Sequence, residues 1–439
     1  MSFVNNTISV FITSVLKVLL SVLGGVIVAR YLSLEERSYY GIIINFIGLL
    51  VVFTNCGWPS AVIVRIGRSD SLIQNITGAT LWAAGLFSVV AILICLLFQD
   101  KILTEFLSIK SADLYLIALM VFPCQLLSGY LCGIARGLHK FNIHNAYHLT
   151  IQFITTCIIV IVLVVLNHGV AELMRVLLLC NVLVTLILLW VIISKTDVNM
   201  NLKNKDFVPI LKFGFKNWIH ALAGNVHIRI DVFMLSSIYL FGDHKQIAFY
   251  IQAVAVLHIV RIFPDAIQST MLPHLSGLKK EALIRECTKA FRHGVFITLI
   301  VVIGFSLIAN RLVPFLYGDK YVEALVPLHI LLPSMVFHTA YQLLLRFWVV
   351  LDKQRVNIII QFIAMIFNIV LNYALIPKYG IKGAAISSAI TYFFEGVIMI
   401  ALFKRYTNQH FLAIFQFNRN EFEIYFKKIN IIKNKYFSS

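Results

Sequence analysis

The sequence contains few charged residues: Asp, Glu, Lys and Arg together occupy 13% of its 439 positions, whereas apolar residues occupy 60%. A soluble globular chain carries about a quarter charged residues. A soluble fold of this size would therefore expose apolar surface over most of its exterior. A bilayer core is crossed by about 20 apolar residues, and the chain has room for roughly a dozen such spans. The composition predicts an all-α polytopic membrane protein.

The seven cysteines lack the CxxC or other spacing that is typical of metal ligands. All but Cys287 lie in apolar runs, where thiols behave as small hydrophobic side chains. We therefore expect no disulfide, no bound metal and no cofactor. The first apolar run, Ile8 to Val28, is long for a signal-peptide core and lacks a small-x-small cleavage site, so we interpret it as a retained first helix.

Long hydrophilic segments are also lacking, so no loop has room for a soluble domain. The longest hydrophilic pieces are 195–212, 277–292 and the tail after Phe403. Apolar runs separated by charged or Pro- and Gly-containing loops predict twelve transmembrane helices. We expect these spans at 8–30, 41–64, 76–98, 114–134, 146–166, 171–194, 213–239, 247–270, 293–315, 324–348, 356–376 and 381–403.

Lysine and arginine predict the orientation of the spans, because basic loops stay on the cytoplasmic side. With the N-terminus inside, 23 of the 37 Lys and Arg residues fall in cytoplasmic segments, 10 in the opposite loops and four within spans. We therefore expect both termini in the cytoplasm. The net charge of +17 is mostly this orientation signal together with attraction to anionic lipid, and it does not indicate a nucleic-acid partner.

The two halves of the sequence resemble each other at an offset of 208 to 211 residues. The matches are Tyr31-Leu32 with Tyr239-Leu240, Pro123 with Pro333, Gln152-Phe153-Ile154 with Gln361-Phe362-Ile363, and Asn167-His168-Gly169-Val170 with Lys378-Tyr379-Gly380-Ile381. Six spans per half give both halves the same orientation, which is typical of a parallel repeat. We expect two pseudo-symmetric six-helix lobes, 1–197 and 198–403, around a central cavity. Residues 404–439 form a basic, aromatic tail that is expected to lie on the cytoplasmic leaflet.

Polar and ionisable side chains recur at three- and four-residue spacing in several predicted spans, which places them on one face of each helix. Ionisable groups at mid-membrane cost several kcal/mol and usually face a cavity or a partner. The candidate site residues on these faces, together with Arg229 on the opposite side of its helix, are Lys17, Gln152, His220, His227, Arg229, Asp231, Arg261, Asp265, Gln361, Asn368 and Glu395.

Such polar faces can also be hydrogen-bonding contacts between helices, and this alternative applies most strongly to the Asn and Gln residues of spans 146–166 and 356–376. Lys17 has no carboxylate within a turn of its own helix, which favours a water-filled or ligand-facing position. Arg261 can pair with Asp265 one turn later. Glu395 lies near a predicted helix end and can simply reach the lipid headgroups.

Short motifs follow one another along the chain. The earlier ones are Ala29-Arg30-Tyr31-Leu32 running into Tyr40-Gly41, Arg136-Gly137-Leu138 with Asn142 and Asn145, and Leu211-Lys212-Phe213-Gly214. The later ones are Arg229 with Asp231, Leu316-Tyr317-Gly318 with Tyr321 and Ala324, and Leu375-Ile376-Pro377-Lys378-Tyr379-Gly380-Ile381-Lys382-Gly383-Ala384-Ala385. Through about residue 405 the sequence resembles the Wzx-type O-antigen and polysaccharide flippases of the multidrug/oligosaccharidyl-lipid/polysaccharide (MOP) exporter superfamily. Ser33-Leu34 departs from the Gly-Pro that usually follows the first motif, which leaves the geometry of this loop open.

The resemblance implies a transporter of the bacterial inner membrane that flips an oligosaccharide repeat unit on a polyprenyl pyrophosphate from the cytoplasmic to the periplasmic leaflet. Lys17, Arg229 and Arg261 would hold the pyrophosphate, and Gln152, Gln361 and Asn368 the sugar hydroxyls. Coupling to H⁺ or Na⁺ would use Asp231, Asp265, Glu395, His220 and His227. Membrane lipids and other polysaccharide-assembly proteins are the expected partners.

Two other functions are weighed against this one. A drug exporter of the same superfamily would carry small cations, and its cavity should favour carboxylates and aromatics; here four basic residues within spans outnumber three acidic ones. An integral glycan polymerase, ligase or acyltransferase would need a catalytic cluster, but the short predicted periplasmic loops contain no His-Asp, Ser-His or paired-carboxylate constellation. We expect a transporter rather than an enzyme.

Overall fold

The computed structural model describes residues 3–67, 73–196, 198–199, 207–239, 243–275, 278–410 and 416. All regular structure in this part of the chain is helical, which confirms the predicted all-α class. The elements of the first half are α1 (Phe3–Tyr31), α2 (Leu34–Thr54), α3 (Trp58–Gly67), α4 (Ile73–Leu97), α5 (Gln99–Lys101), the π-helical η1 (Ile102–Leu107), α6 (Ala112–Gly137), α7 (Phe141–Ile159), the π-helical η2 (Val160–Val165) and α8 (Val170–Thr196). Those of the second half are α9 (Phe207–Met234), the π-helical η3 (Leu235–Tyr239), α10 (His244–Leu275), α11 (Lys280–Tyr317), the 3₁₀ turn η4 (Asp319–Ala324), α12 (Leu325–Val350), α13 (Gln354–Tyr379) and α14 (Ile381–Thr407).

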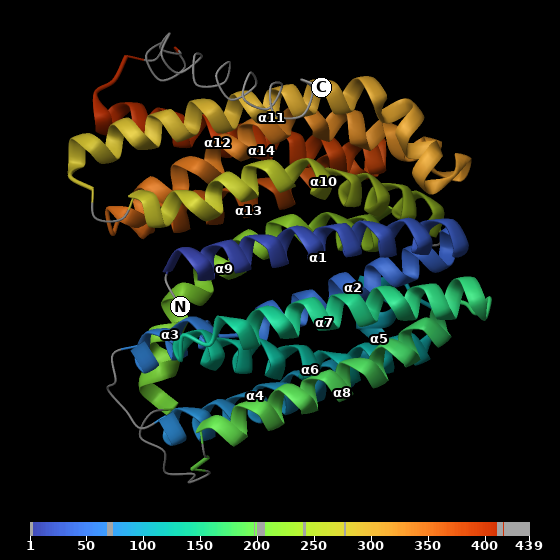
Figure 1. Cartoon of the computed structure of the whole chain (residues 1–439). Coiled ribbons are helices and arrows are strands. Elements are labelled where there is room, and N and C mark those ends of the chain that lie inside the picture. The colour runs from blue at the N-terminus through green and yellow to red at the C-terminus, as the bar shows by residue number, and fades with distance from the viewer. Residues whose placement is uncertain are drawn as a thin grey trace, which may run out of the picture.

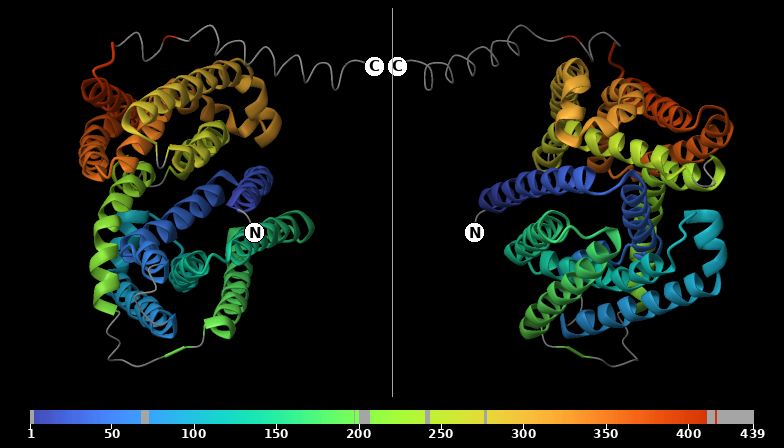
Figure 2. Two further views of the ribbon diagram at one scale, coloured as in Figure 1. Left: turned by 60° about the vertical axis from the view of Figure 1, so that its left-hand side comes forward. Right: turned by 90° about the vertical axis from the view of Figure 1, so that its right-hand side faces the viewer.

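The long helices run side by side in two groups (Figure 1). In the first half, α6 packs against α8 and α3, and in the second half α12 packs against α14 and α11. The groups meet where α2 packs directly against α10 and along two further helices (Figure 2). Helix α9 contacts α13 on one side and α2 and α3 on the other, while α1 contacts α7 as well as α10 and α11. Side chains of α1 and α9 are therefore placed where the two halves meet.

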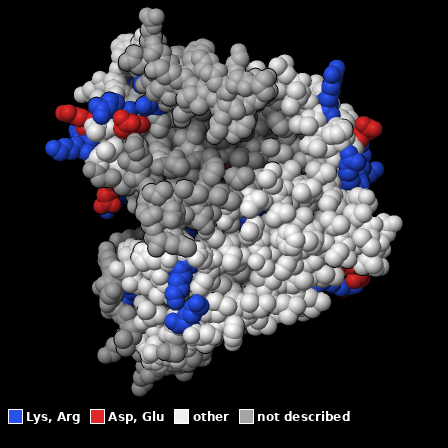
Figure 3. Space-filling model, viewed as in Figure 1, with Lys and Arg blue, Asp and Glu red and all other residues white. Residues whose placement is uncertain are grey.

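Nine of the described helices are long and apolar enough to cross a membrane. They are α2, α4, α6, α7 with η2, α8, α11, η4 with α12, α13 and α14. Three more, α1, α9 and α10, have 29, 28 and 32 residues, which exceeds the length of about 20 that a span requires. On the face shown in Figure 3, the charged side chains of the described residues lie mostly toward the two ends of the helices. The chain is a multi-pass membrane protein, while the count of twelve spans stays a prediction.

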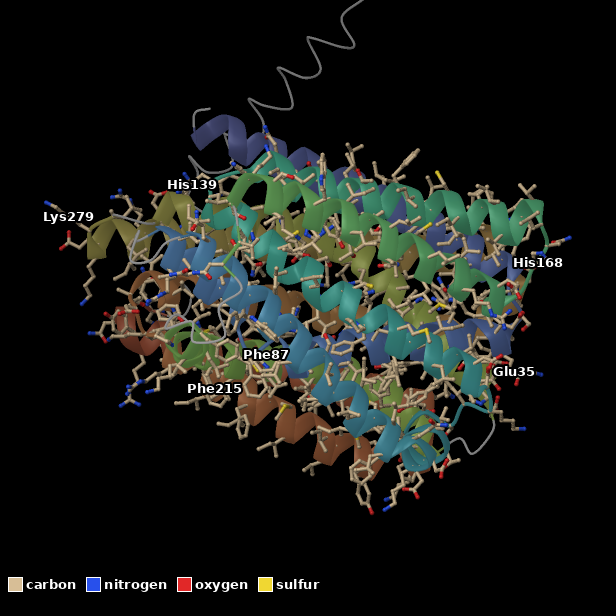
Figure 4. The ribbon with its side chains drawn as sticks, turned by 90° about the horizontal axis from the view of Figure 1, so that it is seen from below. Glu35, Phe87, His139, His168, Phe215 and Lys279 are labelled. Carbon is tan, nitrogen blue, oxygen red and sulfur yellow. The ribbon has the colours of Figure 1, made fainter. Side chains whose placement is uncertain are left out.

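The loops alternate between the two ends of the bundle. His139 and Lys279 lie at one end, and Glu35 and His168 lie at the other (Figure 4). The charge pattern predicts the first pair to be cytoplasmic and the second pair to be periplasmic. The grouping therefore agrees with that pattern, and the choice of which end faces the cytoplasm remains a prediction.

The single span predicted at 41–64 is wrong, because α2 ends at Thr54 and α3 begins at Trp58. Cys56 and Gly57 between them have left-handed backbone angles, φ 48° and 67°, which a right-handed helix does not contain. A Cβ on Gly57 would lie 2.0 Å from the carbonyl oxygen of Gly214 in α9. The break therefore lets the chain turn where α9 passes in backbone contact.

The helix of the span predicted at 293–315 begins earlier, because α11 starts at Lys280, within the hydrophilic segment 277–292, and continues to Tyr317. Leu283, Cys287 and Phe291 recur every four residues and are all buried. This part of α11 is thus an amphipathic helix whose charges face outward. The basic tail lies mostly outside the described residues, since α14 ends at Thr407 and only a few residues beyond it are described.

Candidate functional site

Asp231 is a buried carboxylate at the point where four second-half helices meet. It lies on α9 with 3% of its surface exposed. Its Oδ2 accepts hydrogen bonds from the Tyr250 hydroxyl of α10 at 2.5 Å and from the Ser388 hydroxyl of α14. Its Oδ1 accepts one from Asn372 Nδ2 of α13 at 2.6 Å. These three donors offset the cost of burying the carboxylate.

The polar network around Asp231 continues on α13. Asn372 Nδ2 also donates to Asn368 Oδ1 at 3.1 Å, and Asn368 Nδ2 donates to Ser388 Oγ at 3.4 Å. The Asn372 Oδ1 atom is buried without a hydrogen-bond donor among the described residues. Carboxylate, amide and hydroxyl oxygens are the ligands that hard cations prefer. We call Asp231, Tyr250, Asn368, Asn372 and Ser388 the Asp231 network.

A small cavity of about 20 Å³ adjoins the Asp231 network. Its lining includes Asp231, His258, Arg261 and His338, together with apolar side chains such as Leu331 and Met335. A volume of this size holds roughly one water molecule. The cavity therefore suits a proton-carrying water or a small ion, and it is too small for a sugar.

Arg229 and Asp231 lie on opposite sides of α9, as an ideal helix predicts. Arg229 Nη1 donates to Asn45 Oδ1 of α2 at 3.0 Å. Its guanidinium lies over Gly48, where a Cβ would be only 2.5 Å from Nη1. Asn45 is itself held by a bond from its Nδ2 to the Gly41 carbonyl at 2.9 Å. Helix α9 thus presents its cation to the first half and its carboxylate to the second half.

Lys17, half-buried on α1, lies within a group of basic side chains. His144 and His148 of α7 are within electrostatic reach of Lys17 and of Arg136 from α6, and their rings are 4.5 Å apart at the centroids. In the described part of the chain neither Lys17 nor Arg136 forms an ion pair with a carboxylate. We call Lys17, Arg136, His144 and His148 the Lys17 cluster. Gln152 follows His148 one turn later on α7.

Cys132 of α6 adjoins the Lys17 cluster, and its sulfur and one nitrogen each of His144 and His148 lie within 4.8 Å of one another. Thiolate and imidazole are ligands for soft or borderline metals such as zinc. Spacing along the chain did not suggest this group, because its members come from two helices. The two neighbouring cations, Lys17 and Arg136, oppose a bound cation and favour an anion.

The remaining predicted site residues fall into different surroundings. Arg261 is half-buried on α10 and lines the small cavity. It forms no ion pair with Asp265 within 4.0 Å. Asp265 is exposed and lies within electrostatic reach of Arg261 and Arg346. Glu395 lies in the middle of α14 with 0% exposure, so the alternative that it reaches the headgroups is wrong. Gln361 donates to Glu395 at 3.1 Å. The side chains of His220 and His227 lie outside the described residues.

The family model for polysaccharide biosynthesis proteins matches residues 27–326. The chain belongs to this family. It is 26% identical over 203 residues to a putative O-antigen transporter of Shigella flexneri, covering 46% of this chain and 48% of the relative. The chain thus spans about half the length of the curated relatives it matches.

Two solved structures share the fold of this chain. One is the lipid II flippase MurJ in an inward closed conformation, with a TM-score of 0.74 and 18% identity over 97% of this chain and 96% of that one. The other is a MATE multidrug resistance transporter of the MOP superfamily in an inward-facing conformation, with a TM-score of 0.68 and 15% identity over 91% and 95%. The predicted relation to polysaccharide-exporting proteins is confirmed by the family model, and the chain shares its fold with a lipid II flippase and with a transporter of the MOP superfamily.

Several polar residues of this polysaccharide biosynthesis protein were not selected from the sequence as site residues. Tyr250, Asn372 and Ser388 complete the Asp231 network, and Arg136, His144 and His148 complete the Lys17 cluster. Helical periodicity shows that Asn368 and Asn372 share a face. It does not show which other helix that face meets.

Proposed function

We propose that this protein flips a polyprenyl-pyrophosphate-linked oligosaccharide from the cytoplasmic to the periplasmic leaflet of the bacterial inner membrane. Transport would proceed by alternating access between lobes 1–197 and 198–403. The family, the Shigella relative's name and the shared fold of a lipid II flippase support a transporter over an enzyme.

The observation that carries the proposal is the Lys17 cluster. A lysine, an arginine and two imidazoles from three helices gather without a carboxylate partner in the described residues. Arg136 lies in the last turn of α6 and His144 in the first turn of α7, so the cluster lies toward the end of the bundle that carries the loop at His139. Like charges that gather without an acidic partner favour an anion among them. A pyrophosphate brings several negative oxygens, and charge-assisted hydrogen bonds to Lys and Arg are the strong ones. We assign the pyrophosphate to Lys17 and its cluster, and the first sugars to the adjoining face of α7 with Gln152.

The Asp231 network supplies a site for the coupling ion. A carboxylate surrounded by amide and hydroxyl oxygens next to a cavity for one water molecule suits H⁺ or Na⁺. Asp231 and Arg229 share α9, so occupation of the network can change how Arg229 holds α2. Under this proposal the coupling ion and the cargo bind in different halves of the molecule, which α9 joins.

The test is flipping of a fluorescent polyprenyl-pyrophosphate oligosaccharide in proteoliposomes. Removing one charge-assisted contact costs about 1.5–3 kcal/mol. Lys17→Ala and Arg136→Ala should therefore each lower the flipping rate by roughly tenfold or more. Lys110→Ala, an exposed lysine in the loop before α6, is the matched control and should flip normally.

Normal flipping by both cluster variants would reject the pyrophosphate assignment. The drug-exporter alternative predicts instead that an organic cation is transported and that Lys17→Ala leaves this transport unchanged or faster. The fold does not separate the two functions, because a MATE transporter shares it. The electropositive Lys17 cluster favours the anionic cargo.

A further inference from the structure

Glu395 is a second buried carboxyl group of the second half, distinct from Asp231. Its Oε1 accepts a hydrogen bond from Gln361 Nε2 of α13 at 3.1 Å. Its Oε2 is buried without a hydrogen-bond donor among the described residues. His338 of α12, also buried, places its Nδ1 3.7 Å from this oxygen, too far for a hydrogen bond. One neutral donor does not offset the cost of burying a full negative charge.

The other groups that face Glu395 do not neutralise it. In the described part of the chain no lysine or arginine lies within 4.0 Å of its carboxylate. Tyr341 of α12 is within electrostatic reach of both Glu395 and Arg346, and Tyr392 of α14 is within reach of Glu395, Asp231 and Arg261. Helix α13 contributes neutral amides, and α9 contributes Gly224, where a Cβ would lie 3.1 Å from Gln361 Oε1.

We propose that Glu395 and His338 share one proton and form a proton-binding site separate from the Asp231 network. One proton makes the pair neutral, whether the carboxyl group donates to the imidazole or the imidazolium donates to the carboxylate. In either form a hydrogen bond joins Oε2 to Nδ1 and closes the present gap. A hard metal cation would need about six oxygen ligands, and the carboxylate has mainly an amide and an imidazole around it.

His338 gives this pair a route to the rest of the second half. It lines the small cavity together with Asp231, His258 and Arg261, so a single water can connect the pair to that network. Next to both residues, α12 and α14 cross closely: a Cβ on Gly396 would lie 2.6 Å from the carbonyl oxygen of Phe337. Closing or opening the Glu395–His338 bond therefore acts directly on the spacing of two packed helices.

The inference deepens the proposed function, on which its role in transport rests: proton entry at Glu395 would bias the second half between its transport states. Gln361 transmits the change to α9, because it meets Gly224 two turns before Asp231 on the same helix face. A proton bound at Glu395 and an ion bound at Asp231 would then both act on α9.

The first experiment is pH-difference infrared spectroscopy on the full-length protein in lipid nanodiscs, without cargo. The wild type should show the carbonyl stretch of a buried protonated carboxyl group. The band should disappear in Glu395→Gln, shift in His338→Gln and persist in Asp231→Asn. Glu323→Gln, which changes an exposed acid in η4, is the control and should leave the band unchanged.

A Glu395→Gln spectrum that keeps every protonated-carboxyl band of the wild type would overturn the proposal, and so would bands that are lost only in Asp231→Asn. If Glu395→Gln does not fold, an unshifted band in His338→Gln rejects the shared proton. In proteoliposomes with a pH gradient, Glu395→Gln should flip cargo at the same rate with and without the gradient, whereas the wild type should be stimulated severalfold. A wild type that flips no lipid-linked oligosaccharide would defeat the proposed function and leave the infrared result standing.

Discussion

Arg30 of the first half and Lys320 of the second half each donate hydrogen bonds to backbone carbonyl groups at the helix end near the other residue. Arg30, in the last turn of α1, donates to the carbonyl oxygens of Phe315 and Leu316 at the end of α11, the latter at 2.7 Å. Lys320, just beyond α11, donates to the carbonyl oxygens of Arg30 at 3.1 Å and Leu32 at 2.7 Å. Terminal helix carbonyls lack intrahelical partners and carry partial negative charge, so each cation caps the other's helix.

We predict that this exchange closes one end of the transporter. Arg30→Ala with Lys320→Ala should lengthen and broaden the distance between spin labels at Leu166 and Val322, two exposed positions in the first and second halves. Double electron–electron resonance in a cysteine-free background measures it. Arg311→Ala, which removes an exposed cation from α11, should not change the distance. An unaltered distribution in the double variant would show that other contacts close this end.

A second prediction concerns the break between α2 and α3. Gly57→Ala should strongly destabilise the protein, because alanine is strained at φ 67° by about 1–3 kcal/mol and its Cβ would overlap the Gly214 carbonyl. Gly85→Ala in α4 is the control: nothing lies within 4 Å of its Cβ, and alanine favours a helix by about 1 kcal/mol. Thermal unfolding in detergent compares the two. Equal melting temperatures would mean that α9 can move away from Gly57.

A third prediction tests the contact between Arg229 and α2. Gly48→Ala should push the flexible guanidinium away, since its Cβ would lie 2.5 Å from Nη1, and should break the bond to Asn45. We expect normal folding and a flipping rate reduced to the level of Asn45→Ala. The double variant should be no slower than the slower single variant, because both remove one interaction. Gly25→Ala, whose Cβ meets nothing within 4 Å, is the control. If the losses of the two single variants add up in the double variant, Gly48→Ala does not act through the Arg229–Asn45 bond.

A fourth prediction concerns Asp231→Asn. Asparagine keeps one acceptor oxygen, but its NH₂ group replaces an oxygen that now accepts a hydrogen bond, so two donors would face each other. The free energy of unfolding should therefore fall by about 1–3 kcal/mol. We expect flipping in proteoliposomes to continue more slowly and to lose its response to an imposed H⁺ or Na⁺ gradient. Asp319→Asn, an exposed acid in η4, should retain the response. An undiminished response in Asp231→Asn would remove this residue from ion coupling.

The fold was predictable where apolar length alone decides it. Membrane spans need long apolar helices, and most predicted spans coincide with helices of the structure to within a few residues. The break at Cys56 and Gly57 was not predictable, because it depends on the backbone of α9 coming within contact of Gly57. The start of α11 at Lys280 was missed because its first turns contain many charged residues, and composition alone does not show that the apolar residues between them are buried on one face.

The candidate site was predictable in its residue types and less so in its partners. Helical phase correctly separated Arg229 from Asp231, because both lie on one helix of known geometry. It could not pair Glu395 with His338, or Lys17 with His148, because these residues belong to different helices. The amide of Gln361 donates to Glu395, and the amide of Asn368 is bound within the Asp231 network, which favours the hydrogen-bonding alternative for both residues.

The amino-acid sequence by itself determined that this protein belongs in a membrane, that it is helical and which family it resembles. Each of these follows from local composition and from the order of short motifs. Tertiary structure decided which ionisable groups face one another across helices. Helical periodicity assigns a residue to a face, whereas the energy of a buried charge depends on the atoms of neighbouring helices within a few ångströms.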